Sequence, residues 1–422
     1  MKRIAAIIIR WMHCLVFALV GLPILWLMEF WRPIRIGELM EDRIGHLASN
    51  TELYARLARR RGQPTSRTIF VAWNPANRPL LEIWKRYIPI VESRLACHFI
   101  VGCRPLIKRT RFFEQLPDIP VIEDDAYLND PPIIRFSEQE EERGRAGLKA
   151  MGVQPDDWFV CFHARDPSYL ADRKGFGAAQ YRSSYLDCSI DNYVLAMQWI
   201  VEQGGVAIRV GSAVEKILPD LGPRIIDYAT NHHDPFMDVY LGARCRFFIG
   251  NNSGLFSISR IFNVPWALAN LCPMPWVGKA GWRNMDIPKL LRRKSDGHIM
   301  TFPEIAEAEM LECYKDEPER LRALFKPDPS EALKYEWIEN SPEDVLAMCM
   351  DMYDMAEGRP LDPEGLRLQD AFNRLYVKGY TQLNGGGISP RFALRHRQLI
   401  EPGTMMKSET TERPATATRG AS

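Results

Sequence analysis

The sequence predicts an α/β protein in which two doubly wound, Rossmann-like domains follow an N-terminal hydrophobic helix and precede a set of C-terminal helices. Short apolar segments alternate with amphipathic segments along most of the chain, which is typical of parallel sheets with crossover helices. This alternation runs twice, before and after an acidic stretch at 138–150. The length of 422 residues agrees with two or three domains, because a domain has about 150 residues.

The composition excludes several broad classes of protein. Lys and Arg number 54 and Asp and Glu number 53, so the formal charge is +1, whereas a general nucleic-acid binder carries a strong basic excess. A hydrophobic fraction of 46% excludes a mostly disordered chain. The nine cysteines are dispersed without a CxxC pair, which argues against a disulfide framework and a structural zinc site. We therefore expect reduced thiols and no nucleic-acid partner.

The N-terminal segment, residues 1–31, is predicted to attach the protein to a membrane. Residues 11–28 carry no charge over eighteen positions, which meets the lower bound of about 17 residues for a membrane helix. No A-x-A-like cleavage site follows, so an anchor is favoured over a cleaved signal peptide, and a buried helix is the remaining alternative. Cations flank the segment on both sides, which leaves its orientation and a shallow insertion open.

The first half of the chain carries the elements of an N-terminal Rossmann-like domain, assigned to residues 32–150. Apolar runs predict strands at 33–39, 68–74 and 98–103, and amphipathic runs predict helices from Leu47 to about Arg61 and at 78–94. The acidic stretch at 138–150 is expected to be a solvated helix that links the two domains.

The second half repeats the pattern in a domain assigned to residues 151–335. Near-continuous apolar runs are typical of strands buried on both faces of a sheet. They predict strands at 158–166, 206–211, 224–229 and 264–270, and a strand followed by a tight loop over 246–254. Helices are predicted between them at 191–205, 237–244 and 255–262. A helical extension is expected at 336–402, and a flexible tail at 403–422.

Polar residues that follow predicted strands form the candidate site, because ligands of open α/β sheets bind beyond the carboxyl ends of the strands. Four segments meet this condition: Arg43 to His46, His163 to Asp166, Arg209 with Gly211, and Asn251 to Gly254. Alternation along an extended segment places His163 and Arg165 on the same side of the chain.

Three of these segments together predict an anion site for a diphosphate. The guanidinium groups of Arg165 and Arg209 match the forked geometry of phosphate oxygens. The amides of Ser253 and Gly254 precede a predicted helix, whose N-terminus favours negative charge, and glycine allows a close approach. Each feature alone has a structural alternative, namely an ion pair for either arginine and an ordinary turn for the glycine.

Histidines are the candidates for acid–base catalysis, because imidazole titrates near neutral pH. His46 and His163 lie in the predicted site, with a structural role as the alternative for each. Two clusters are reminiscent of metal ligands, 232–234 and 123–125, but the first has no further spaced ligand and the second is more simply an acidic loop. We therefore expect no metal and no cofactor.

Several common catalytic motifs are absent from the sequence. A GxxxxGK motif followed by Ser or Thr does not occur, no GxGxxG follows a predicted strand, and no GxSxG is present. P-loop, common dehydrogenase and serine-hydrolase functions are therefore excluded.

The ordered motifs of the chain resemble a family of bacterial glycosyltransferases that are encoded with surface-carbohydrate genes. The resemblance covers roughly residues 32–300 and rests on RIGHLASNTELY (43–54), FHARD (162–166), YRSSYLDCSIDNY (181–193), VAIRVG (206–211), IIDYA (225–229) and CRFFIGNNSGLFSISRIFNVPWALAN (245–270). The HxRD segment is also loosely similar to the HxR segment of fucosyltransferases, in which the arginine contacts the donor diphosphate.

The resemblance implies a GT-B-like architecture with a nucleotide-sugar donor held mainly by the second domain. Arg165 would contact the diphosphate, and His46 or His163 would deprotonate the acceptor hydroxyl. The residues assigned to substrate binding are Arg43, Gly45, Asp166, Tyr181, Arg182, Arg209, Gly211, Asp227, Asn252, Ser253 and Gly254.

The function expected from these observations is metal-independent transfer of a sugar from a nucleotide sugar to a cell-envelope glycan or a lipid-linked acceptor. The expected location is the bacterial inner membrane, with the catalytic domains facing the cytoplasm. Two alternatives remain open at this point. One is transfer of a pyruvyl or phosphoryl group to a glycan, and the other is a non-catalytic, membrane-tethered carbohydrate-binding component.

Overall fold

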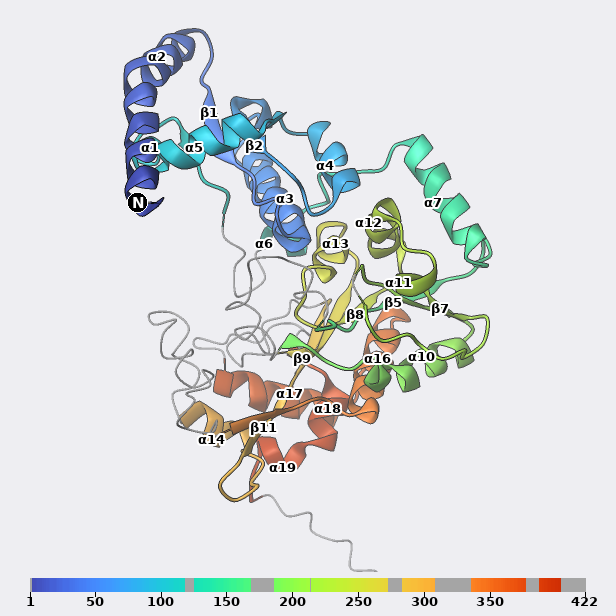
Figure 1. The fold of residues 1–422 in the computed structure, drawn as a ribbon. Coiled ribbons are helices and arrows are strands. Elements are labelled where there is room, and N and C mark those ends of the chain that lie inside the picture. The colour runs from blue at the N-terminus through green and yellow to red at the C-terminus, as the bar shows by residue number, and fades with distance from the viewer. Residues whose placement is uncertain are drawn as a thin grey trace, which may run out of the picture.

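The computed structural model describes residues 2–117, 125–167, 186–212, 214–271, 283–307, 335–376 and 387–403, with side chains from residue 8 onward. It contains an N-terminal helix and two α/β domains, joined by the acidic helix α7 (Glu138–Ala150) (Figure 1). Both domains have wholly parallel principal sheets, which confirms the predicted fold class.

The first domain is built on a four-stranded sheet in the order β3-β2-β1-β4. Its strands are β1 (Arg35–Glu38), β2 (Thr68–Ala72), β3 (Ile90–Glu92) and β4 (Phe113–Glu114). Its helices are α3 (Ile44–Arg60), the 3₁₀ turn η2 (Thr65–Arg67), α4 (Arg78–Lys85), α5 (Arg94–Ile107) and the short α6 (Asp125–Asn129).

Two predicted elements of the first domain are wrong. The apolar run at 98–103 lies inside helix α5 and is not a strand, while the helix predicted over 78–94 ends at Lys85 and is followed by strand β3. Ser93 caps the N-terminus of helix α5, because its hydroxyl accepts a hydrogen bond from the amide of Ala96 at 3.2 Å. The run is apolar on more than one side because α5 packs on the sheet with one face and on the N-terminal helix with another.

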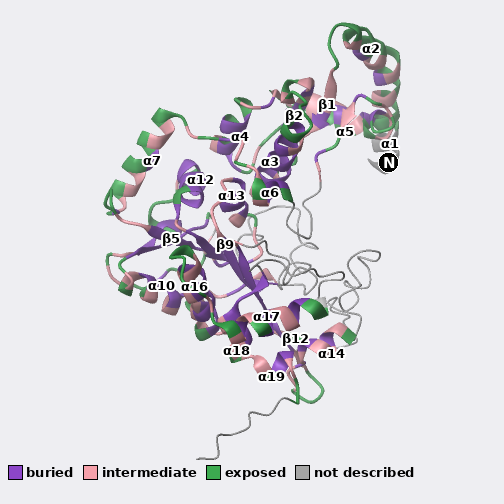
Figure 2. Ribbon diagram, turned by 180° about the vertical axis from the view of Figure 1, so that it is seen from behind, coloured by how far each residue is buried: buried purple, intermediate pink, exposed green. Residues whose placement is uncertain are grey.

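The N-terminal helix consists of α1 (Lys2–Val16), a π-helical turn η1 (Phe17–Gly21) and α2 (Leu22–Trp31). One stretch, Ile8–Trp31, is long and apolar enough to cross a membrane, and only 11% of its most apolar window is buried (Figure 2). The helix crosses α5 at Gly102, where a Cβ atom would lie 1.9 Å from Nδ1 of His13. The close crossing fixes the helix to the first domain, while its other faces expose apolar side chains.

The second domain is built on a seven-stranded sheet in the order β13-β10-β9-β8-β5-β6-β7. Its strands are β5 (Phe159–Phe162), β6 (Val206–Arg209), β7 (Ile225–Asp227), β8 (Phe248–Gly250), β9 (Trp266–Leu271), β10 (Met285–Pro288) and β13 (Gly387–Ile388). The intervening helices are α10 (Asp191–Glu202), α11 (Tyr228–Asn231), α12 (Pro235–Arg244) and α13 (Phe256–Ile261). Six of these strands follow the order of a complete Rossmann sheet.

The C-terminal elements are built into the second domain. Helices α14 (Phe302–Glu307), α16 (Pro342–Ala356), α17 (Pro363–Tyr376), α18 (Pro390–Arg395) and α19 (Arg397–Ile400) pack below the sheet in the view of Figure 1. Strands β11 (Leu290–Arg293) and β12 (Tyr335–Ile338) form an antiparallel pair, and β13 adds an edge to the main sheet. The predicted tail from residue 404 onward lies outside the described residues.

The two domains share a packed interface. Helix α3 lies against α13 and helix α4 against α12, and side chains of α12 and α13 belong to the same apolar cluster as those of α3. Arg56 of α3 is fully buried and donates hydrogen bonds to Ile261 O and Asn263 Oδ1 of the second domain, both at 2.9 Å. A charged group at this depth requires such partners, so Arg56 ties the two domains together.

Candidate functional site

Both sheets contain a topological switch point, at which successive crossover connections diverge to opposite sides. In the second domain this point lies between β5 and β8, and in the first domain it lies between β1 and β4. A crevice opens beyond the carboxyl ends of the strands at such a point, and ligands of doubly wound sheets bind there. The residues that follow β1, β5 and β8 therefore define the candidate site.

His163 lies at the switch point of the second domain. Its backbone amide donates to Ile249 O of β8, and its ring Nδ1 lies 2.9 Å from Val210 O beyond β6. Because a carbonyl only accepts hydrogen bonds, Nδ1 carries the ring hydrogen and Nε2 is an acceptor. Burial, reinforced by the charges of Arg209 and Arg165, lowers the pKa of His163 to about 4, so the ring is neutral at pH 7.

Both predicted arginines of the second domain are paired with carboxylates. Nε of Arg165 lies 3.2 Å from Oδ1 of Asp187. Nη1 of Arg209 lies 3.1 Å from Oδ2 of Asp227 and donates to Lys216 O at 2.5 Å, and the residue is 1% exposed. The guanidinium of Arg209 is thus engaged within the protein, which favours a positioning role over the direct diphosphate contact predicted from the sequence.

A cavity of about 370 Å³ opens beside the carboxyl ends of β5 and β6. Its charged lining residues are Asp166, Asp187, Glu215 and Glu339, with Arg209 and Lys216. Four carboxylates against two cations suit neutral groups that donate hydrogen bonds, such as sugar hydroxyls, better than phosphate oxygens. Asp166 also shapes the cavity, because its Oδ2 accepts from the backbone amide of Glu215 at 3.0 Å.

The turn between β8 and α13 is closed by its own hydrogen bonds. The amide of Ser253 donates to Asn251 O at 2.7 Å, and Asn251 Nδ2 donates to Leu186 O at 2.6 Å. The predicted phosphate contact through the Ser253 amide therefore does not agree with this geometry, because that donor is already used. The Ser253 hydroxyl is buried without a hydrogen-bond partner among the described residues, so it is the polar group of the turn that a ligand could engage.

In the first domain, helix α3 begins beside the switch point and carries His46 in its first turn. Nδ1 of His46 lies 3.0 Å from Oδ1 of Asn50, whose Nδ2 donates to Pro117 O at 2.7 Å just beyond β4. The amide of Asn50 is oriented by this second bond, so neutral His46 carries its hydrogen on Nδ1 and leaves Nε2 as a proton acceptor. Arg43 precedes the helix, is exposed, and has no ion-pair partner among the described residues.

The two switch points meet at a contact between two glycines. A Cβ atom at Gly45 would lie 2.8 Å from Cα of Gly254, and one at Gly254 would lie 2.9 Å from N of Gly45. Backbone therefore touches backbone at this place, which only residues without side chains allow. The contact brings the predicted segments 43–46 and 251–254 together, although they belong to different domains.

Of the remaining predicted site residues, three lie near the strand ends and two fall outside the described residues. Gly211 follows β6, and a Cβ atom there would lie 3.6 Å from Nδ1 of His163. Asp227 is buried as the partner of Arg209, and Asn252 is half-buried on the turn. Tyr181 and Arg182 lie outside the described residues.

The structure adds residues at the carboxyl end of β2 that the sequence analysis missed. The amide of Trp73 donates to Oε1 of Glu41 at 2.7 Å, and burial raises the pKa of this carboxyl group. Asn74, next in the chain, has a φ of +63°, a conformation that is uncommon outside functional or turn positions. Trp73 is half exposed, and its ring offers a surface for a sugar face. The rule that ligands bind beyond the carboxyl ends of the strands, here called the strand-end rule, could have selected Trp73, because this residue directly follows an apolar strand.

The two clusters that are reminiscent of metal ligands have structural partners. His233 Nε2 lies 3.1 Å from Oδ2 of Asp238, and Asp125 pairs with Arg60 at 2.7 Å. Residues 123 and 124 lie outside the described residues. Within the described ranges, no three His, Cys, Asp or Glu side chains are grouped so that they could share a metal ion.

Comparisons with known proteins give distant matches to solved structures only. No model of a known protein family matches the chain, and no curated protein matches it. Among solved structures, ADP-heptose lipopolysaccharide heptosyltransferase II of Escherichia coli is 14% identical with a TM-score of 0.37, over 56% of this chain and 84% of that one. A family 9 glycosyl transferase of Veillonella parvula is 12% identical with a TM-score of 0.45, over 77% and 97% of the two chains.

A third match is the iron-containing dodecameric glycosyltransferase TibC of enterotoxigenic Escherichia coli, which is 11% identical with a TM-score of 0.30 over 57% of each chain. Likenesses at these values are too distant to transfer a function or a metal to this chain.

Proposed function

We propose that the protein is a glycosyltransferase that moves a sugar from a nucleotide sugar to an acceptor hydroxyl. The observation that supports this proposal best is the contact between Gly45 and Gly254, because it joins the ligand-binding switch points of two Rossmann-like sheets. Two such crevices that face one another can hold the two substrates of a transfer reaction next to each other. The motif resemblance of residues 32–300 points to the same activity.

The second domain would hold the donor. Carboxylates of the 370 Å³ cavity would accept hydrogen bonds from donor hydroxyl groups. Arg165 would neutralise charge on the departing diphosphate, together with Arg43, which is exposed and lacks an ion-pair partner among the described residues. Arg209 would act as a positioning residue, because it fixes Lys216 O and Asp227 behind the cavity.

The first domain would activate the acceptor. Nε2 of His46 would take the proton from the acceptor hydroxyl as its oxygen attacks the anomeric carbon of the donor. The bond from that carbon to the diphosphate oxygen then breaks, and its electron pair leaves with the nucleoside diphosphate. We favour His46 over His163 as the base, because a histidine with a pKa of about 4 accepts a proton poorly at neutral pH.

The N-terminal helix would place this chemistry at a membrane. Its exposed apolar faces, including those of Trp11, Trp26 and Trp31, suit the interior and the interface of a bilayer. An acceptor built on a lipid, or a cell-envelope glycan, would then be presented next to the first domain. Orientation toward the cytoplasm is part of the proposal, because nucleotide sugars are made there.

The proposal is tested with full-length protein in detergent and a panel of UDP-, GDP-, CMP-, dTDP- and ADP-sugars. The correct donor should raise the melting temperature and release its nucleoside phosphate slowly in the absence of acceptor. If no nucleotide sugar of the panel raises the melting temperature and none is hydrolysed, glycosyl transfer is overturned. A pyruvyl or phosphoryl transferase or a carbohydrate-binding component would then be favoured.

Two variants assign the roles. His46→Asn should lower turnover by about 100-fold or more without weakening donor binding, while Arg165→Ala should weaken donor binding. His98→Asn and Arg94→Ala are matched controls, because both residues are exposed on α5 away from the switch points. Activity should persist in EDTA, and loss of turnover that Mn²⁺ restores would contradict metal independence and direct attention to residues 123–125.

A further inference from the structure

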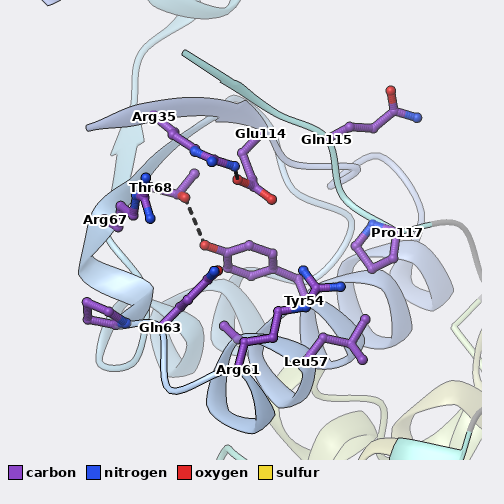
Figure 3. Close-up of a pocket in the computed structure, with 12 residues that line it drawn as sticks. Arg35, Tyr54, Leu57, Arg61, Gln63, Arg67, Thr68, Glu114, Gln115 and Pro117 are labelled. Atoms are coloured by element: carbon purple, nitrogen blue, oxygen red, sulfur yellow. Dashed lines mark hydrogen bonds and ion pairs between the residues drawn. The ribbon is translucent and has the colours of Figure 1, made fainter. Parts of the chain in front are cut away.

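A second site is formed by a pocket of about 150 Å³ in the first domain (Figure 3). It lies where β1 and β2 begin, between the C-terminal half of α3 and the segment that follows β4. Tyr54 forms its floor and donates to Thr68 Oγ1 at 2.8 Å. Tyr54 lies eight residues along α3 from His46, or about 12 Å, so the pocket is separate from the proposed acceptor site.

The pocket collects positive charge that the part of the chain described by the structure does not neutralise. Arg35, Arg61 and Arg67 line it, with Glu114 as the single carboxylate among the lining residues. Glu114 pairs with Arg35 at 2.5 Å. Arg61 and Arg67 have no carboxylate partner among the described residues, and the buried Nε of Arg67 has no hydrogen-bond acceptor.

Two guanidinium groups without carboxylate partners among the described residues line one concave site, and this arrangement suits an anionic ligand with several oxygen atoms. A buried donor without a partner is costly, so native structures supply an acceptor for it in nearly every case. A guanidinium presents donors in a planar fork that matches the oxygens of a phosphoryl group. The net charge of the charged lining residues is +2, which equals the charge of a phosphate dianion with opposite sign.

The pocket also lies next to the end of the membrane helix. Arg32, the residue after α2, donates to Ser66 Oγ at 2.7 Å, and Ser66 directly precedes Arg67. The loop that carries Arg61 and Arg67 is therefore tied to the place where the chain leaves the apolar helix. If the apolar helix lies in a membrane, a phosphoryl group at this place would come from a lipid headgroup or from an anion dissolved at the membrane surface.

We infer that this pocket binds a phosphoryl group through Arg61 and Arg67. The inference does not depend on glycosyl transfer, because neither Arg61 nor Arg67 takes part in the proposed transfer. The pocket shares Pro117 with the surroundings of His46, since the carbonyl of Pro117 accepts the hydrogen bond from Asn50. Its failure would leave the proposed function intact, and loss of transferase activity would leave this site intact.

The test measures binding of inorganic phosphate and pyrophosphate to full-length protein in a neutral detergent by calorimetry at low ionic strength. The double variant R61Q/R67Q should bind at least about tenfold more weakly than the wild type, because two charge-assisted hydrogen bonds are removed. R94Q/R145Q is the matched control, since it removes the same charge from exposed residues outside the pocket. Equal binding by the pocket variant and the control would overturn the inference.

A second measurement identifies the source of the phosphoryl group. Each protein is reconstituted in nanodiscs of phosphatidylcholine alone, which serve as the reference, or of phosphatidylcholine mixed with phosphatidylglycerol. The melting temperatures in the two kinds of nanodisc are then compared. A rise with phosphatidylglycerol in the wild type and control, but not in R61Q/R67Q, supports a lipid headgroup. Stabilisation by dissolved phosphate alone, lost in R61Q/R67Q, supports a free anion. No difference between R61Q/R67Q and the control in either arm contradicts the site.

Discussion

The candidate binding regions of the two domains differ in how their arginines are paired. In the second domain, Arg165 and Arg209 are buried at strand ends and paired with Asp187 and Asp227. In the first domain, Arg43, Arg61 and Arg67 lie nearer the surface without carboxylate partners among the described residues. The guanidinium of Arg209, engaged by Asp227 and Lys216 O, fixes the shape of its site, whereas the unpaired arginines keep their donors for a ligand. Arginine at a predicted site therefore has to be interpreted from its partners, and the predictions for Arg209 and Arg43 test this contrast.

The largest expected effect is on stability and concerns the buried pair. Arg209→Ala should lower the free energy of unfolding by about 3–5 kcal/mol, because it leaves Asp227 buried without its counter-charge. Denaturant unfolding followed by circular dichroism measures the change. Arg94→Ala, an exposed arginine, should stay within about 0.5 kcal/mol of the wild type. Equal free energies of unfolding for the two variants would show that the pair of Arg209 and Asp227 does not stabilise the fold.

The next effect concerns His163 and depends on pH. Its pKa is about 4 in the folded state, below the ordinary value near 6.5, so the unfolded state binds a proton first as the pH falls. The free energy of unfolding should therefore fall as the pH decreases from about 6.5 to about 4. At the lower end, His163 should account for a loss of about 3 kcal/mol.

His163→Asn should remove this part of the acid dependence, because asparagine has no proton to gain. The measurement is the free energy of unfolding of the wild type and the variant at several pH values. His98→Asn, at an exposed site, serves as the control. Parallel curves for the wild type and His163→Asn would contradict a lowered pKa.

A smaller effect tests the contact that joins the two switch points. Gly45→Ala places a Cβ atom 2.8 Å from the backbone of Gly254, so it should cost about 1–3 kcal/mol and reduce activity. Alanine is otherwise favoured over glycine in a helix. Gly147→Ala in α7 is the matched change, because its nearest neighbour is the flexible side chain of Met237. A neutral result for Gly45→Ala would mean that the domains separate easily at this contact.

The smallest effect on stability is expected at an unpaired arginine of the first domain. Arg43→Gln should leave the free energy of unfolding within about 0.5 kcal/mol, because the side chain is exposed and has no ion pair to lose. Donor binding should nevertheless weaken by about tenfold, as one charge-assisted hydrogen bond is removed. Titration with the donor identified by the nucleotide-sugar panel measures it. Unchanged affinity would remove Arg43 from the proposed diphosphate site.

Much of the fold and the neighbourhood of the site could be predicted from the sequence, because buried parallel strands have a clear apolar signature. The strand ends at His163, Arg209 and Gly250 are adjacent, as predicted, since β8, β5 and β6 are neighbours. Pairing could not be predicted, because Arg209 meets Asp227 only once β6 and β7 are in register. The contact of Gly45 with Gly254 likewise depends on how two domains pack.

The errors have a common physical cause. Helix α5 is apolar on more than one side, because it is covered by both the sheet and the N-terminal helix, so its sequence resembles a buried strand. The pocket of Arg61 and Arg67 was missed because it lies on loops where strands begin, away from the edge that the strand-end rule selects. Tertiary packing decides both features, and no local pattern encodes it.

The crossing of His13 over Gly102 bears on how the protein would reach an acceptor. A flexible linker would let a catalytic domain search a deep volume above the bilayer. Here the connection between the apolar helix and the first domain is too short to act as a flexible linker, since α2 ends at Trp31 and β1 begins at Arg35. In a membrane, the height and tilt of the crevice would be set by the helix itself, and only hydroxyl groups within one thin layer of the surface would come within range.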